Sequence, residues 1–195
     1  SNDVGVFGRI SFLIFIVVLG IESARQTVAR LKKGRRVEEL EQFALNDSMT
    51  GMYNRNAYDY FVKNEKDFEG YVIVTFDLNN LKQCNDQYGH RAGDGYIINA
   101  AHIIEDNFER YGKCYRIGGD EFCCIIPKGR YFKIERVMHK IDQDVEILNH
   151  KNIIPVPVGI AYGYAVFTED DTDPEKVRER ADEDMYRNKK AMKQS

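Results

Sequence analysis

Two glycines followed by two acids, Gly118-Gly119-Asp120-Glu121, stand between two short runs of strand-forming residues, 115–117 and 122–126. Paired glycines in this setting predict a tight β-hairpin, which would present Asp120 and Glu121 at its tip. Adjacent carboxylates repel each other, and a divalent cation or a metal-bound polyphosphate would remove that repulsion. The pattern taken by itself is more typical of a plain solvated turn, so the rest of the sequence must decide.

A further acid, Asp77, ends the predicted buried strand 71–76 and is followed directly by a predicted short helix, 78–87. Acids at strand ends commonly contact ligands, and the free N–H groups of the following helix suit phosphate oxygens. If this strand neighbours the hairpin, Asp77 and Asp120 meet at one edge. Their oxygens, with water and substrate phosphates, would make a Mg²⁺ or Mn²⁺ site suited to nucleotidyl transfer.

Polar side chains that could bind a nucleotide follow the same strand. Lys82 and Asn85 share one face of the predicted helix, where Lys82 could reach a phosphate and Asn85 a base edge. Asp94 could accept hydrogen bonds from N1 and N2 of guanine. Each has a plainer interpretation, because Lys82 and Asn85 also fit a solvated helix face and Asp94 fits an N-cap. A structural loop histidine is the favoured interpretation of His90.

Composition limits the possible functions. The 195 residues are enough for one domain with an extension, and 43% hydrophobic and 30% charged residues are typical of a globular core. The formal net charge of -3 argues against a general binder of long nucleic acids. The four cysteines form no Cys-x-x-Cys pair and are predicted to be small buried side chains in a reducing compartment: Cys84, Cys114, Cys123 and Cys124.

The N-terminal residues 1–45 differ from the rest. Residues 10–21 are nearly all apolar, and 4–7 extend this run to the threshold for a membrane span. Arginines and lysines at 25–36 suit the cytoplasmic side of a membrane. The alternative is a buried segment of an incomplete neighbouring domain. Residues 22–44 predict a helix, either a dimeric connecting helix or a solvated linker.

Strands and helices alternate through residues 46–195. Apolar periodicity predicts helices at 55–64, 93–111, 131–149 and 174–193, and a strand or strand pair is predicted at 156–167 in addition to strand 71–76 and the hairpin. This order predicts a mixed α/β domain in which helices pack on a sheet.

In combination, these motifs resemble the GGDEF-domain diguanylate cyclases. The resemblance begins at 47–55, continues through 77–82, 85–86, 89–90, 93–94 and 116–122, and ends with the helix that contains Ala181-Asp182, Met185-Tyr186 and Lys189. It implies an α+β, palm-like nucleotidyl-cyclase fold with a central, mostly antiparallel sheet flanked by helices. It also implies condensation of two GTP into cyclic di-GMP with release of two pyrophosphates.

The resemblance assigns roles by position. It implies Mg²⁺ or Mn²⁺ held by Asp77, the Leu78 carbonyl, Asp120 and Glu121, with Glu121 or a metal-bound hydroxide as general base. It implies that guanine is read by Asn85 and Asp94. It implies phosphate contacts from the N–H groups of Asn80 and Leu81 and from the side chains of Lys82, Arg116, Lys189 and Lys193.

Some positions depart from the family pattern. Asn79 stands where many members have a second Asp, and Lys193 stands where an Arg is frequent, so the bidentate fork is lost. The inhibitory product site needs an arginine and an aspartate where this chain has Glu109 and Gly112. Product feedback through that site is therefore not expected.

The resemblance implies that each domain holds one GTP, so that turnover requires a homodimer. The N-terminal segment would then connect the domain to an upstream sensor or membrane region. Three alternatives stand beside this hypothesis: a catalytically silent GTP-binding regulatory module, a cyclase that makes a mixed cyclic dinucleotide, and a plain structural domain. Asp94 favours guanine among these, because adenine lacks the hydrogens that a carboxylate would accept there.

Overall fold

The computed structural model describes residues 19–20, 22–23, 25–26, 44–129 and 133–192. The chain divides into two compact units, 1–43 and 44–195. In the first unit, the described residues are helical. The predicted apolar span at 4–21 and the predicted helix at 22–44 lie almost wholly outside the described residues. No helix within the described ranges combines the length and apolarity needed to cross a membrane, and the membrane tether stays a prediction.

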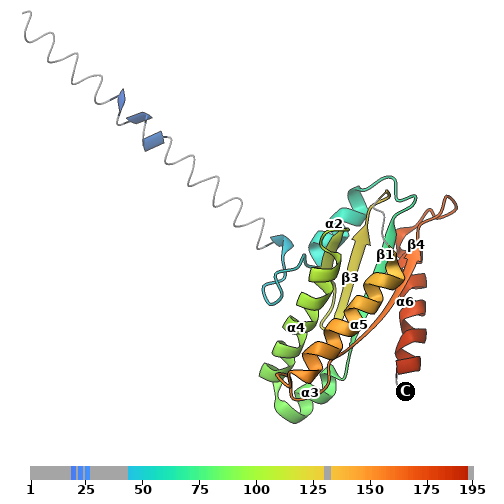
Figure 1. Ribbon diagram of the computed structural model, residues 1–195. Coiled ribbons are helices and arrows are strands. Elements are labelled where there is room, and N and C mark those ends of the chain that lie inside the picture. Colours follow the sequence, from blue (N-terminus) through green and yellow to red (C-terminus); the bar gives the residue numbers. More distant parts are fainter. Residues whose placement is uncertain (1–18, 21, 24, 27–43, 130–132, 193–195) are drawn as a thin grey trace, which may run out of the picture. The chain divides into compact units, whose positions relative to one another are not determined.

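The second unit is built on a four-stranded sheet in the order β2-β3-β1-β4 (Figure 1). Its strands are β1 (Val72–Asn79), β2 (Lys113–Arg116), β3 (Glu121–Ile126) and β4 (Gly159–Val166). Each neighbouring pair is antiparallel. The predicted hairpin is confirmed, as is the predicted class of a mostly antiparallel sheet flanked by helices. Strand β3 of the hairpin pairs with β1, which meets the condition set for bringing the acids together.

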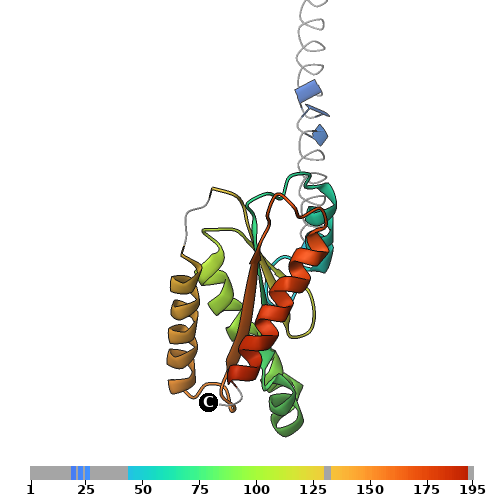
Figure 2. The same ribbon diagram turned by 90° about the vertical axis from the view of Figure 1, so that its right-hand side faces the viewer.

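Helices cover both faces of this sheet: α2 (Arg55–Asn64), α3 (Leu81–Tyr88), α4 (His90–Phe108), α5 (Ile134–His150) and α6 (Pro174–Met192). Figure 2 shows α4 and α5 on one side of the sheet and α6 on the other. The alternation of β1 accounts for this arrangement. Val74, Phe76 and Leu78 are buried in the core shared with α4 and α5, whereas Ile73 is buried in the core shared with α2 and α6.

The four cysteines are buried, as predicted. Cys114 and Cys124 are opposite each other across β2 and β3, with their sulfurs 2.9 Å apart. They pack in the core on the α4 and α5 side of the sheet, whereas Cys123 packs on the α6 side.

Two predicted boundaries were wrong in ways that affect the site. Strand β1 continues to Asn79, because it pairs with β4 as far as Gly159, and α3 begins only at Leu81. Between them, Asn80 adopts a left-handed conformation (φ 64°), which asparagine tolerates better than most residues. Helix α4 begins at His90 and not at 93. Asp94 therefore lies inside α4, and its interpretation as an N-cap is wrong.

The remaining helices keep closer to prediction. The predicted helix 55–64 matches α2, with Asn54 as N-cap accepting from the Ala57 N–H at 3.0 Å. The Asn54 side chain also donates to the carbonyls of Ala44 and Asn46, which closes the turn that precedes the helix. Residues 156–167 supply one strand, β4, and not a strand pair.

Candidate functional site

Asp77 and Glu121 are directly opposite each other on the two central strands, β1 and β3. The register places Glu121 opposite Asp77, while Asp120 lies just before β3 and accepts the Leu78 N–H through its carbonyl at 3.0 Å. Glu121 is exposed, as predicted, and Asp120 is half-buried. Side chains directly opposite in an antiparallel pair have Cβ atoms about 5 Å apart, and like charges there repel. A positive charge beside this pair of carboxylates would therefore be stabilising.

The hairpin between β2 and β3 gives Glu121 its place. The N–H groups of Ile117 and Gly118 both donate to the Glu121 carbonyl, at 3.0 and 3.2 Å. A Cβ at Gly118 would lie 2.9 Å from Glu121 Oε2, so the first glycine makes room for the acid. The two glycines of the motif thus lie in a four-residue loop, 117–120, and not in a two-residue turn.

Lys189 of α6 supplies positive charge to Asp77, through a contact between Nζ and Oδ1. The two side chains are 25% and 15% exposed. Helix α6 reaches this position because β4 has Gly163 beneath it: a Cβ there would lie 2.0 Å from the Met185 nitrogen. Lys189 is therefore brought to the acids from the far C-terminal end of the described chain.

The same acids fit a divalent metal ion. Within the described residues, no three or more His, Cys, Asp and Glu side chains are grouped as metal ligands. Mg²⁺, however, is usually bound by one or two carboxylates together with water and substrate phosphates. Asp77 and Glu121 offer two hard oxygen donors on adjacent strands, and their repulsion is what a cation would offset. The donor set therefore fits Mg²⁺ or Mn²⁺, with the Leu78 carbonyl and Asp120 next to it in the chain.

The start of α3 follows directly after these acids. Asn80 caps this eight-residue helix without a side-chain hydrogen bond, and its carbonyl accepts the first helical bond, from the Cys84 N–H at 2.9 Å. The N–H groups of the first helical turn have no intrahelical acceptor. Lys82 is exposed on this turn. The predicted phosphate-binding groups Asn80, Leu81 and Lys82 are thus adjacent to Asp77 in the chain and at one helix end.

Asn85 and Asp94 are brought into the same region by the packing of α3 on α4. A Cβ at Gly93 would lie only 2.0 Å from Asn85 Oδ1, so the Asn85 side chain occupies the space that Gly93 leaves free. Asp94 is the next residue and is exposed. The predicted guanine-reading pair therefore lies at one α3–α4 contact, which Gly93 makes possible.

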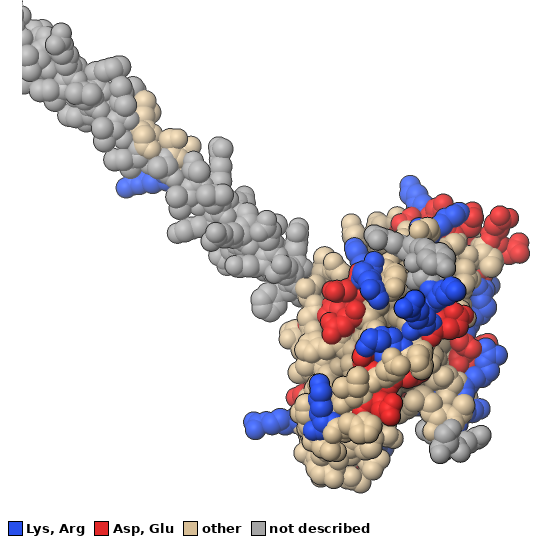
Figure 3. All heavy atoms as spheres, in the orientation of Figure 1, with Lys and Arg blue, Asp and Glu red and all other residues tan. Residues whose placement is uncertain are grey.

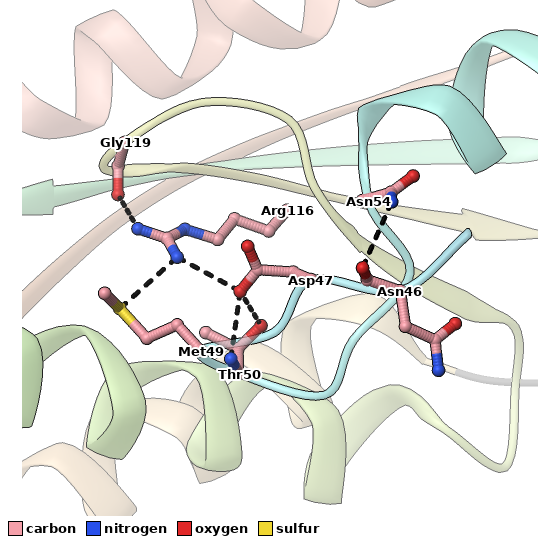
Figure 4. Close-up of polar contacts among 7 residues, drawn as sticks. All are labelled: Asn46, Asp47, Met49, Thr50, Asn54, Arg116 and Gly119. Carbon is pink, nitrogen blue, oxygen red and sulfur yellow. Dashed lines mark hydrogen bonds and ion pairs between the residues drawn. The ribbon is translucent and has the colours of Figure 1, made fainter. Parts of the chain in front are cut away.

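Arg116 makes contacts different from those predicted for a phosphate-binding side chain. Its guanidinium lies between Asp47 Oδ1 (3.0 Å), Met49 Sδ (3.3 Å) and the Gly119 carbonyl (2.9 Å), as Figure 4 shows. Burial acts against the charged form of Asp47. Hydrogen bonds from Thr50 and from the Arg116 guanidinium outweigh it and hold the pKa of that carboxyl below its ordinary value. Arg116 thus joins the turn at 47–50 to the tip of the hairpin.

The other predicted positions are distributed as follows. Lys193 lies outside the described residues. Glu109 is exposed at the end of α4, and Gly112 precedes β2. A Cβ at Gly112 would lie 2.1 Å from the Ile125 carbonyl oxygen, so backbone fills the place of any side chain there.

A groove of about 1200 Å³ lies elsewhere, between α4 and α5. It belongs to the opposite side of the sheet from Asp77 and Glu121. Figure 3 shows lysine and arginine side chains among acidic ones on the face toward the viewer. This mixture is not the one-sign surface of a general nucleic-acid binder. The convergence of acids, a lysine and a helix end identifies the candidate site better than groove volume does.

Sequence reasoning missed two contributors to the site. One is Asp47, whose pairing with Arg116 joins residues far apart in the chain; the only signal was an acid within the turn motif. The other is Tyr96, a fully buried tyrosine of α4 whose hydroxyl contacts the end of β1. A polar aromatic residue within the apolar side of a predicted helix was the available signal, because a buried hydroxyl needs a partner.

A family model described as diguanylate cyclase, GGDEF domain, matches residues 44–195. The chain belongs to the GGDEF family. The predicted resemblance is thereby confirmed. Among solved structures, the coiled coil and GGDEF domain of DgcB from Caulobacter crescentus has a TM-score of 0.73 at 23% identity. That match covers 89% of this chain and 95% of the other, and at this identity it supports the fold alone.

Curated relatives include the bifunctional diguanylate cyclase/cyclic di-GMP phosphodiesterase MucR of Pseudomonas aeruginosa, 31% identical over 71% of this chain. The diguanylate cyclase DgcS of Shewanella oneidensis is 29% identical over 78%, and the cyclic di-GMP phosphodiesterase PdeR of Escherichia coli is 28% identical over 89%. The matches span 22%, 52% and 26% of these relatives' own lengths, respectively.

Proposed function

We propose that this GGDEF domain is a diguanylate cyclase, which condenses two GTP into cyclic di-GMP and releases two pyrophosphates. The observation that carries the proposal is the cross-strand pair of Asp77 and Glu121 beside the start of α3. Two acids that need a cation, next to N–H groups that suit phosphate, match what nucleotidyl transfer requires. The names of MucR and DgcS support the same activity.

Guanine is the proposed base. Asp94 can accept from both N1 and N2 of guanine, and Asn85 can donate and accept at the same edge. The close contact between Asn85 and Gly93 supports this assignment, since it sets the amide beside the residue that precedes Asp94. Adenine has no pair of adjacent hydrogens for the carboxylate, so GTP is expected to be preferred over ATP.

The proposed metal site consists of Asp77, Glu121, Asp120 and the Leu78 carbonyl. Mg²⁺ or Mn²⁺ bound there would lower the pKa of the attacking 3′-hydroxyl and offset charge on the leaving pyrophosphate. Lys189 contacts Asp77 in this structure and would exchange that carboxylate for a substrate phosphate as a cation binds. The N–H groups of Asn80 and Leu81, with Lys82, would hold the remaining phosphate oxygens. Glu121, exposed opposite Asp77, is the proposed acceptor of the 3′-hydroxyl proton.

Turnover is proposed to need a dimer of such domains. Each domain binds one GTP, and the 3′-hydroxyl of each nucleotide attacks the α-phosphate of the other. A two-fold arrangement brings both reactions together, and holding the reactants in line supplies part of the barrier reduction. Residues 1–45 would connect the domain to an upstream sensor or membrane region that controls this encounter, with the catalytic domain in the cytoplasm.

Product feedback through the family's inhibitory site is proposed to be absent. Glu109 has the wrong charge for the arginine of that site. Gly112 cannot gain the required aspartate without movement of the backbone at Ile125, which a Cβ would approach to 2.1 Å. The proposed absence of the inhibitory product site therefore rests on backbone packing at Gly112 as well as on the identity of the side chains.

Turnover of GTP with Mg²⁺ by the wild-type chain and by Asp77→Asn tests the proposal. We expect wild-type protein to make cyclic di-GMP and the variant to lose more than about a hundredfold in rate, since metal-assisted charge stabilisation is worth several kcal/mol. Asp106→Asn is the matched control, because Asp106 is an exposed acid of α4. Equal rates for Asp77→Asn and wild-type protein would refute the proposal.

The alternative is a silent GTP-binding module. The contact between Lys189 and Asp77 favours this alternative, because the positive charge of Lys189 can neutralise the Asp77 carboxylate when no metal is bound. Wild-type protein that binds GTP but forms no product at any metal concentration would support this alternative.

A further inference from the structure

The hydroxyl of Tyr96 stands at the end of the β1–β4 ladder. Asn79 and Gly159 are the last paired residues of these strands. The Gly159 N–H donates to the Tyr96 hydroxyl at 2.7 Å, and that hydroxyl donates to the Asn79 carbonyl. Tyr96 is fully buried, so water does not compete for these bonds. One side chain of α4 thus bridges the two strand ends.

The bridged carbonyl belongs to the peptide that joins Asn79 to Asn80. In a planar trans peptide the N–H points opposite to the C=O. The Asn79 carbonyl is directed to Tyr96 in the core on the α4 side, so the Asn80 N–H must point away from that core. Asn80 itself has a left-handed φ of 64°, a conformation that asparagine tolerates better than most residues. The direction of this N–H is therefore set by the Tyr96 hydroxyl.

We propose that Tyr96 is a positioning residue that orients the Asn80 N–H toward the GTP phosphates. This inference rests on the proposed function, in which Asn80 and Leu81 bind phosphate. Tyr96 lies two residues after Asp94 on the same helix. It therefore connects the part of α4 that reads the base to the turn that holds the phosphates. Burial raises the pKa of the Tyr96 hydroxyl to about 12, so it keeps its proton for the Asn79 carbonyl at working pH.

Tyr96→Phe removes the bridge and keeps the ring. A non-hydrolysable GTP analogue should bind about fivefold more weakly, because a buried hydrogen bond is worth about 1 kcal/mol and each 1.4 kcal/mol is a factor of ten. Guanosine, which has no phosphate, should compete equally well for variant and wild-type protein. In turnover, KM for GTP should rise while kcat changes less. A purely structural role would weaken the analogue and guanosine alike, which would overturn the proposal.

Tyr58→Phe is the matched control. Tyr58 is also a fully buried tyrosine, but it belongs to α2 and packs in the core on the α6 side of the sheet, and its hydroxyl has no hydrogen-bond partner among the described residues. This variant should bind both ligands as the wild-type protein does. If it weakens the analogue as much as Tyr96→Phe does, the effect is not specific to the bridge and the proposal fails.

Amide hydrogen exchange of the wild-type chain tests the same idea without any variant. The Gly159 N–H should exchange slowly, and the Asn80 N–H should become protected when the GTP analogue binds. An Asn80 N–H that exchanges equally fast with and without the analogue would contradict the proposal. These measurements need no turnover. A chain that binds GTP without making product would refute the proposed cyclase activity, and the role of Tyr96 in phosphate binding could still be tested by the same exchange measurement.

Discussion

Arg116 and Lys189 have the same charge and the same predicted role at phosphate, yet the chain holds them differently. Arg116 has three partners from two segments and is 11% exposed, whereas Lys189 contacts one carboxylate and is 25% exposed. Arg116 joins the turn at 47–50 to the hairpin tip. Lys189 neutralises the acid that is proposed to bind metal.

The contacts of Arg116 are those of a structural cation, whereas Lys189 is proposed to act on metal and nucleotide binding. The contacts of Arg116 involve both terminal nitrogens of its guanidinium and hold it between the turn at 47–50 and the hairpin tip. Lys189 is a flexible point charge that can transfer from a carboxylate to a phosphate within reach. We therefore expect substitution of Arg116 to affect stability most, and substitution of Lys189 to affect metal and nucleotide binding most.

The largest expected effect belongs to Arg116→Met. It leaves Asp47 charged and partly buried and frees the Gly119 carbonyl, so unfolding free energy should fall by about 2–3 kcal/mol. Urea denaturation followed by circular dichroism measures this loss. Arg116→Lys should recover only part of it, because lysine lacks the planar fork. If Arg116→Met lowers the free energy of unfolding less than Lys189→Met does, the assignment of Arg116 as the structural cation is wrong.

A smaller change in stability is expected for Lys189→Met. Lys189 has one partner where Arg116 has three, so the free energy of unfolding should fall by about 1 kcal/mol. Without its competitor at Asp77, the protein should bind Mn²⁺ severalfold more tightly when no nucleotide is added, while KM for GTP should rise. Titration calorimetry with Mn²⁺ alone measures the first effect. Weaker Mn²⁺ binding would show that Lys189 does not compete for Asp77.

The sequence predicted the helix α2 and the β2–β3 hairpin, because these follow from local periodicity and turn residues, whereas the pairing of the hairpin with β1 was only a hypothesis. It did not predict that Glu121 is the residue opposite Asp77, since register depends on how whole strands align. The partners of Arg116 and the bridge at Tyr96 join residues distant in the chain, which local patterns do not encode. The space that Gly93 leaves for Asn85 depends on how α3 packs on α4, which local patterns do not encode either.

The central claim is that two of these domains act together on two GTP. Specific activity measured with GTP and Mg²⁺ over a range of protein concentrations tests it most directly. The account predicts cyclic di-GMP as the product, two pyrophosphates per product, and a specific activity that rises with concentration to a plateau as dimers form. Bound GTP with no product at any concentration, or a specific activity independent of concentration down to the highest dilution, would contradict it.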